Sequence, residues 1–89
     1  MIVIIDKTFE KDIEIISDRK LLNSIADKIE NIQKAKKLND IHNCKKLRGS
    51  KNSYRIRIGD YRIGFIYENK IVELIRFLHR NKIYNYFPD

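Results

Sequence analysis

The sequence contains little of what disulfide-bonded, membrane-spanning or flexible multidomain proteins require. Its 89 residues include one cysteine, one proline, three glycines and no tryptophan. Cys44 alone cannot form an internal disulfide, and no apolar run approaches the ~20 residues needed to cross a bilayer. Residues 1–25 also lack the pattern of a secretory signal. We therefore expect a cytoplasmic protein without membrane association.

A metal or small-molecule cofactor is not expected either. His42 and Cys44 lie two residues apart, but zinc sites require four ligands, or three and a water, and no second cysteine is present. Gly59 and Gly64 fall within strand-like patterns rather than within a phosphate-binding loop. The sequence therefore predicts no metal and no cofactor.

The basic residues are concentrated in the second half of the chain. Length and hydrophobic content fit one compact domain, expected over residues 1–89. Residues 1–44 carry eight basic and eight acidic residues, whereas residues 45–89 carry eleven basic and four acidic ones. The whole net charge of +7 therefore belongs to residues 45–89. Such a distribution favours a surface that binds nucleic acid, although a merely solvated basic face is a common alternative.

Hydrophobic patterns predict an α+β fold. The run "IVII" at residues 2–5 is too short for a helix and predicts a strand buried on both faces. A short helix capped by Thr8 and a second helix over residues 20–37 then form a helical hairpin. Residues 38–52 show no sustained periodicity and are predicted to be a long loop.

The remaining chain predicts an antiparallel meander of three strands, at residues 53–58, 61–68 and 71–79. Together with the N-terminal strand they give a four-stranded sheet packed by the helices. The C-terminal tail could form a single helical turn. Three of its side chains could pack against the sheet: Ile83, Tyr84 and Phe87.

The stretch "SYRIRIGDYRIGFIY", residues 53–67, defines a β-hairpin in detail. Gly59-Asp60 between two alternating runs is typical of a two-residue hairpin loop. Five cross-strand pairs follow: Ile58 with Tyr61, Arg57 with Arg62, Ile56 with Ile63, Arg55 with Gly64, and Tyr54 with Phe65. One face of the hairpin is apolar and must pack against the helices. The other, the arginine face, carries Arg55, Arg57 and Arg62.

The arginine face needs an explanation, because like charges directly opposed across two strands destabilise a sheet. A bound phosphodiester would convert this repulsion into shared attraction, since guanidinium groups match phosphate oxygens and stay charged. Gly64 would leave a space in which a ligand approaches the backbone. The alternative is that these arginines only solubilise an exposed face of the sheet. With three of them on one face, we favour nucleic-acid binding.

Three motifs resemble the toxins of the RelE/ParE superfamily, the toxin halves of type II toxin-antitoxin modules. They are "KKLRGS", "YRIRIGDYRIGF" and "RFLHRNKIY", and the resemblance covers nearly the whole chain. The RelE branch implies an endoribonuclease that cleaves mRNA in the ribosomal A site, by attack of the ribose 2′-OH on the adjacent phosphate. It also implies a cognate antitoxin protein that neutralises the toxin.

The resemblance implies two sets of site residues. Those implied in catalysis are Arg57, Arg62, His79, Arg80 and Tyr84. Those expected to bind RNA are Lys45, Lys46, Arg48, Lys51 and Arg55. Where some relatives carry a lysine base on the strand, this chain has arginine, which does not deprotonate in proteins. His79 is the natural candidate for the base, and water or ribosomal RNA could replace it.

Two other functions remain open. A ParE-like toxin would inhibit DNA gyrase without cleaving nucleic acid, and it would not need a cation cluster beside an aromatic side chain. A basic RNA- or ribosome-binding domain without catalysis is the other alternative, which the missing lysine base keeps open.

Overall fold

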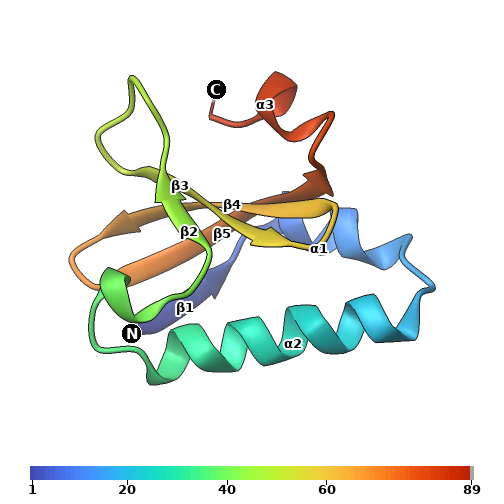
Figure 1. Ribbon diagram of the computed structural model, residues 1–89, viewed down its shortest axis with the longest axis horizontal. Helices are drawn as coiled ribbons and strands as arrows, with labels where there is room; N and C mark the ends of the chain where they lie inside the picture. The colour runs from blue at the N-terminus through green and yellow to red at the C-terminus, as the bar shows by residue number, and fades with distance from the viewer. Residues whose placement is uncertain (89) are drawn as a thin grey trace.

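A single five-stranded β-sheet forms the centre of the molecule (Figure 1). The computed structural model describes residues 1–88. The strands lie in the order β1-β5-β4-β3-β2; β1 pairs with β5 in parallel, and the other three pairs are antiparallel. The strand bounds are β1 (Ile2–Ile5), β2 (Cys44–Lys46), β3 (Ser53–Ile58), β4 (Tyr61–Glu68) and β5 (Ile71–His79).

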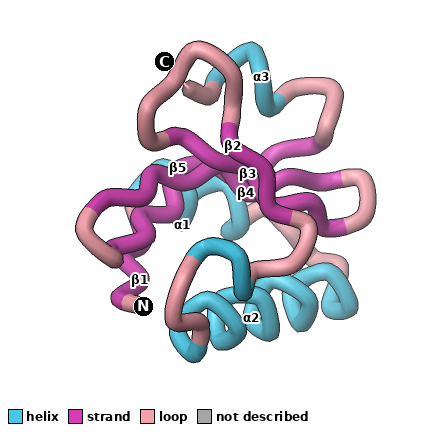
Figure 2. Tube along the Cα trace, turned by 60° about the vertical axis from the view of Figure 1, so that its left-hand side comes forward, coloured by secondary structure: helices cyan, strands magenta, loops and turns pink. Residues whose placement is uncertain are grey.

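The helices lie on both sides of this sheet. Helices α1 (Lys7–Glu14) and α2 (Arg19–Lys34) form the predicted hairpin, and the 3₁₀ turn η1 (Leu38–Asp40) follows them. The short helix α3 (Ile83–Tyr86) lies on the opposite side of the sheet from α2 in both views (Figures 1 and 2). The α+β class and the C-terminal turn are therefore confirmed. Residue 89, part of the predicted domain, lies outside the described residues. Within residues 1–88, every helix is too short or too polar to cross a membrane.

The predicted hairpin register is confirmed at all five pairs, from Ile58–Tyr61 to Tyr54–Phe65. Its apolar face, which we call the helix face, packs against α1 and α2. The largest fully buried side chains gather between these layers. Those of the helices and sheet are Phe9, Ile32, Ile56, Ile63, Phe65, Val72, Leu74 and Phe77.

Strand β1 is an edge strand, so the prediction that it is buried on both faces was wrong. Ile2 is 63% exposed and Ile4 is 46% exposed, whereas Val3 packs against the core. The reason is that β1 pairs with β5 on one side and carries helices over one face. A run of β-branched residues predicts a strand but does not reveal how many of its sides are covered.

Residues 38–52 contain more structure than the predicted long loop. Besides η1, they include strand β2, whose residues Cys44, Lys45 and Lys46 pair with Ile56, Arg55 and Tyr54 of β3. The sheet therefore has five strands rather than the predicted four. A three-residue edge strand with two lysines gives no hydrophobic alternation, and charged residues are common on such edges.

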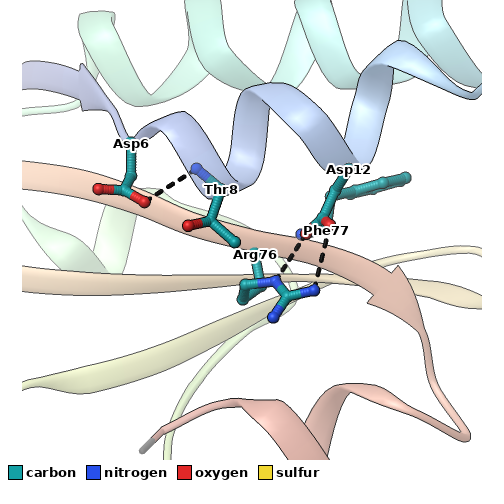
Figure 3. Close-up of polar contacts among 5 residues, drawn as sticks. All are labelled: Asp6, Thr8, Asp12, Arg76 and Phe77. Carbon is teal, nitrogen blue, oxygen red and sulfur yellow. Dashed lines mark hydrogen bonds and ion pairs between the residues drawn. The ribbon is translucent and has the colours of Figure 1, made fainter.

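Asp6, rather than the predicted Thr8, caps helix α1. Its side chain accepts a hydrogen bond from the backbone N–H of Thr8 at 3.0 Å (Figure 3). Hydrogen bonding from Thr8 holds the pKa of the Asp6 carboxyl below its ordinary value of 3.8, because the bond favours the charged form. Asp18 caps α2 in the same way through the N–H of Leu21. Both caps fix the start of a helix that packs on the sheet.

Candidate nucleic-acid interface

Four residues from four neighbouring strands form one row across the arginine face. Pairing places Lys45 opposite Arg55, Arg55 opposite Gly64, and Gly64 opposite Arg76. Directly paired residues point to the same face of a sheet, so the row contains three cations and one glycine. Figure 3 shows the guanidinium of Arg76 on the side of β5 that faces α3.

The gap at Gly64 is filled by the chain itself. A Cβ atom added at Gly64 would lie 2.5 Å from Cδ2 of Phe87 and 2.8 Å from its Cγ. The ring of Phe87 therefore rests directly on the Gly64 backbone, and Phe87 is 2% exposed. The sequence correctly suggested a close approach at this glycine, but the expectation that a ligand uses the space was wrong.

The C-terminal segment crosses the arginine face with its side chains divided between burial and exposure. Ile83 and Phe87 are buried, whereas Tyr84 is 55% exposed and Tyr86 is 53% exposed. The guanidinium carbon of Arg76 lies 5.2 Å from the ring centroid of Tyr86, a cation–π contact. Of the three side chains expected to pack against the sheet, two do so, and Tyr84 remains accessible.

A pocket of about 340 Å³ lies between the C-terminal segment and strands β2 and β3. Every charged residue among its described lining residues is a cation. The lining residues are Lys45, Lys46, Leu47, Arg48, Arg55, Tyr84, Phe87 and Pro88. We call this the basic pocket. It unites four of the five predicted RNA-binding residues with Tyr84.

Two cations of the basic pocket, Arg55 and Lys46, belong to different faces of the sheet. Arg55 donates a hydrogen bond from Nη1 to the carbonyl oxygen of Asn43 at 3.1 Å, which fixes its guanidinium beside β2. Lys46 pairs with Tyr54, a residue of the helix face, although it also lines the pocket. Lys51, the fifth predicted RNA-binding residue, is exposed in the loop between β2 and β3 and is not among the lining residues.

The other predicted arginines lie toward the tip of the β3–β4 hairpin. Arg57 and Arg62 face each other directly across the two strands. Nη1 of Arg62 donates to the carbonyl oxygens of Gly59 and Tyr61, each at 2.9 Å, so this side chain folds onto the hairpin turn. The backbone N–H of Arg80 donates a hydrogen bond to the backbone carbonyl oxygen of Asp60 at 2.8 Å. This bond brings Arg80 to the same turn.

A β-bulge in β5 changes which side chains share the arginine face. The pairs Phe65–Leu74 and Gly64–Arg76 leave one extra residue, Ile75, on β5. One extra residue shifts every later side chain of the strand to the opposite face. Arg76 therefore points to the arginine face.

The same bulge places His79 on the helix face, away from the predicted arginines. His79 pairs with Tyr61, whose ring it contacts edge-on at 5.5 Å. Its Nδ1 atom accepts a hydrogen bond from the backbone N–H of Asn81 at 3.2 Å. The register therefore places His79 and Arg62, which were both expected in catalysis, on opposite faces of the sheet.

Cys44 and His42 show no sign of a metal site. Within residues 1–88, no three His, Cys, Asp or Glu side chains are close enough to hold a metal ion. Burial raises the pKa of the Cys44 thiol above its ordinary value of 9.0, and the charges of Arg55 and Lys28 oppose that shift. Cys44 is therefore a protonated side chain near neutral pH.

Three contributors were not predicted as site residues. Phe87, which was expected only to pack against the sheet, and Pro88 line the pocket, and Asp12 holds Arg76. Asp12 accepts hydrogen bonds from Nε of Arg76 at 2.8 Å and from its Nη2 at 3.1 Å (Figure 3). The glycine within a strand was the one available signal for Phe87. Asp12 gave no comparable signal, because its partner lies 64 residues away along the chain.

Comparison with known proteins gives a consistent result. The family model described as the ParE toxin of type II toxin-antitoxin system, parDE, matches residues 3–84. Toxin RelE3 of Methanocaldococcus jannaschii is 42% identical over 91 residues, which cover 99% of this chain and 100% of that protein. A chain in the RelB-RelE antitoxin-toxin complex from Methanococcus jannaschii matches with a TM-score of 0.80 and 38% identity over 96% of this chain and 99% of that chain.

A more distant structure shares the fold. A chain of the archaeal RelE-RelB complex from Pyrococcus horikoshii matches with a TM-score of 0.71 and 19% identity, over 92% of this chain and 97% of that chain. The family match spans nearly all of the sheet and helices described above. The chain therefore belongs to the RelE/ParE superfamily, the toxins of type II toxin-antitoxin systems.

Proposed function

We propose that this toxin is an endoribonuclease that cleaves mRNA in the ribosomal A site. The observation that carries the proposal is the basic pocket, in which Tyr84 stands beside Lys45, Arg48 and Arg55. Cations that contact phosphates next to an exposed aromatic ring match the way proteins bind single-stranded RNA, whose bases stack on such rings. The similarity to Toxin RelE3 supports the same function.

In the proposed reaction, the ribose 2′-oxygen attacks the adjacent phosphorus. A bond from O2′ to phosphorus forms, the bond from phosphorus to the 5′-oxygen breaks, and a cyclic phosphate and a 5′-hydroxyl result. Arg57 and Arg62 stabilise the extra negative charge of the transition state. Arg62 must then exchange its bonds to the carbonyls of Gly59 and Tyr61 for bonds to phosphate. Arg80, at the same turn, adds a third cation.

The proton of the 2′-OH goes to water or to ribosomal RNA, and a proton from water goes to the leaving 5′-oxygen. His79 is not suited to this role, because its side chain lies on the helix face and its Nδ1 is engaged by Asn81. The pocket side chains bind and orient: Lys45, Arg48 and Arg55 hold phosphates, and Tyr84 stacks on a base. The protein thus contributes position and charge, while the ribosome completes the site.

The partner that controls this activity is a cognate antitoxin protein. The similar solved chain from Methanococcus jannaschii comes from a RelB-RelE antitoxin-toxin complex. We propose that the antitoxin of this toxin covers the basic pocket or displaces the C-terminal segment, which would remove Tyr84 from the RNA path. Action on ribosomes places both proteins in the cytoplasm.

A ParE-like inhibitor of DNA gyrase is the second candidate, and the ParE description of the matching family model favours it. Such an inhibitor need not bring an aromatic ring and phosphate-binding cations together. A basic domain that binds RNA or ribosomes without cleaving is the third candidate. All three would place nucleic acid or a nucleic-acid enzyme near the arginine face, so an activity measurement must separate them.

The deciding experiment compares two tyrosines of α3 in bacteria. Tyr84 and Tyr86 are nearly equally exposed, but only Tyr84 is among the described lining residues of the basic pocket. Wild type, Tyr84→Ala and Tyr86→Ala are induced, new 5′ ends in mRNA are mapped, and DNA supercoiling is followed. We expect codon-phased cleavage by wild type and Tyr86→Ala and strong loss with Tyr84→Ala.

The other outcomes identify the competing functions. Growth arrest with intact mRNA and altered supercoiling would establish the gyrase inhibitor. Ribosome binding without new 5′ ends would establish the non-cleaving domain. Cleavage by both tyrosine variants at the wild-type level would show that the basic pocket takes no part in the mechanism.

A further inference from the structure

We propose that Phe87 is a positioning residue that holds Tyr84 in the basic pocket. Residue 64 must then be glycine, because the Phe87 ring packs directly on its backbone. This inference rests on the proposed function, because it assigns Tyr84 a role in RNA cleavage. It adds Phe87, which lies outside the three sequence motifs. Phe87 acts through Tyr84 and does not itself touch the scissile phosphate.

The first support is how closely the ring fits the glycine. Three ring atoms of Phe87 lie within 2.5–2.9 Å of where a Cβ of residue 64 would be. Real Cβ atoms do not tolerate such distances, so no larger residue fits at position 64 while the ring stays in place. Within residues 1–88, the glycines with positive φ are Gly49 and Gly59. Gly64 thus has ordinary strand backbone, and the space above it explains the glycine better than backbone strain does.

The second support is that α3 cannot fix its own position. It contains four residues, and no side chain caps its N-terminus. Isolated helices of this length are unstable, so packing must hold them. Two anchors do so: Ile83 is 0% exposed and Phe87 is 2% exposed. Their backbones are joined by a 2.8 Å hydrogen bond from the N–H of Phe87 to the carbonyl of Ile83.

Tyr84 lies between these anchors along the chain and is otherwise exposed. No hydrogen bond involving its side chain is found among the described residues, so the turn that carries it sets its place. The neighbouring Tyr86 gives a weaker anchor, since it is 53% exposed and contacts Arg76 through a cation–π interaction. Movement of Phe87 would therefore move Tyr84 relative to Arg55 and Lys45.

The position of Phe87 in the cross-strand row strengthens this conclusion. Gly64 pairs with Arg55 on one side and with Arg76 on the other. The apolar ring thus lies over β4, between an arginine of β3 and an arginine of β5. Arg55 remains on the pocket side, and Arg76 remains with Asp12 and Tyr86.

The test uses Gly64→Ala, which adds a methyl group where the ring now lies. We expect kcat on mRNA in ribosome complexes with an empty A site to fall about tenfold or more, because small displacements of positioned groups cost that much. KM should change by less than about twofold, because the phosphate contacts of Lys45 and Arg48 are retained. Unchanged kcat in a folded Gly64→Ala variant would overturn the inference.

A double-mutant cycle separates positioning from general damage. If Gly64→Ala acts through Tyr84, it should cost less than about twofold in the Tyr84→Ala background. Equal losses in both backgrounds would show that Gly64 acts on the fold as a whole and would refute the positioning role. Gly64→Ala combined with Phe87→Leu provides the rescue, since the smaller side chain leaves room for the methyl group. We expect it to recover at least part of kcat.

A spectroscopic reading keeps the inference testable if cleavage itself is not found. The chain has no tryptophan, so Tyr84→Trp introduces a single tryptophan at the pocket, whose emission can be followed separately from that of the tyrosines. Adding Gly64→Ala should change its emission maximum and its quenching by acrylamide, while circular dichroism stays the same. Absence of RNA cleavage by wild type would refute the proposed function but not the positioning role of Phe87. An unchanged emission spectrum would refute that positioning role, whether or not the protein cleaves RNA.

Discussion

The carboxylate of Asp12 holds the Arg76 side chain and the backbone N–H of Phe77 at the same time. Its Oδ2 lies 2.8 Å from Nε of Arg76 and 2.9 Å from the N of Phe77, and its Oδ1 lies 3.1 Å from Nη2 of Arg76. Strand β1 pairs with β5 only as far as Leu74. Helix α1 thus supplies, through Asp12, the acceptor that a longer β1 would have provided.

Asp12→Ala should destabilise the fold strongly. It removes the acceptor of the Phe77 N–H and a carboxylate that forms an ion pair with the guanidinium of Arg76, whose side chain is 20% exposed. Losing one partner of a largely buried, hydrogen-bonded ion pair costs about 3 kcal/mol. Urea denaturation measures the loss. Glu14→Ala, an exposed acidic residue of the same helix, is the matched control and should change stability by less than about 0.5 kcal/mol. Equal effects of the two variants would contradict this role of Asp12.

Lys70→Gly should stabilise the protein. Asn69 and Lys70 form the two-residue turn between β4 and β5 and have φ values of 51° and 63°. A non-glycine residue in this left-handed region costs about 1 kcal/mol, and Asn-Gly is the favoured sequence for such turns. The melting temperature should rise by about 4 °C. Lys51→Gly, which removes a lysine from a loop position without positive φ, should not raise it; a rise with both would show that charge, not backbone strain, is responsible.

Lys45→Ala combined with Arg48→Ala should weaken RNA binding and its salt dependence together. Each cation that contacts a phosphate of single-stranded RNA contributes about 0.7 to the slope of log affinity against log salt. The double variant should therefore reduce that slope by about 1.4. Fluorescence anisotropy with a short oligoribonucleotide measures it. Lys7→Ala with Lys11→Ala removes the same charge from exposed positions of α1, and an equal reduction there would refute a specific contact in the pocket.

Arg62→Ala and His79→Gln should have very different effects on mRNA cleavage. Removing Arg62 takes a cation from the proposed transition state and should lower the rate by about 10² to 10³. His79 lies on the other face of the sheet, so His79→Gln should stay within about threefold of wild type. Single-turnover cleavage on ribosome complexes measures both rates. A loss with His79→Gln as large as that with Arg62→Ala would show that the histidine reaches the RNA.

Cys44 should titrate at a higher pH in the folded protein than in the unfolded chain. Burial raises the pKa of its thiol above 9.0 and outweighs the opposing charges of Arg55 and Lys28. Since only the thiolate reacts, the fraction available for alkylation at any pH below the folded pKa is smaller than in urea. The rate of iodoacetamide alkylation against pH gives the inflection directly, and Cys44 is the only cysteine that can react. An inflection at or below 9.0 would contradict burial as the dominant influence.

The parts of the fold that local patterns determine were predictable. The β3–β4 register followed from strict alternation on both sides of Gly59-Asp60, because a shift by one residue would have turned every apolar side chain to water. The helical hairpin followed from the spacing of its apolar residues. Strand β2 was missed because Lys45 and Lys46 pair through their backbones and leave no pattern in the side chains.

The parts of the site that depend on distant contacts were not predictable. The extra residue, Ile75, moves the later side chains of β5 to opposite faces, and without it His79 would have shared the face of Arg62. The seating of Phe87 on Gly64 joins residues from different strands and segments. The charged residues of the pocket were found because they cluster in sequence, whereas the contacts of Phe87 with Gly64 and of Asp12 with Arg76 could be found only in three dimensions.

The strand order also has a consequence for when the toxin acquires its shape. Ile2 pairs with Ile71, and Phe9 packs its ring edge-on against Phe77, so the first strand and first helix meet their partners only after β5 has been synthesised. Contacts between such distant parts of a chain form slowly, because a long loop must close first. A growing chain therefore cannot complete its sheet one strand at a time. The pocket around Tyr84 also needs Phe87 and Pro88, which follow β5 in the chain, so it too can form only after β5 has been synthesised.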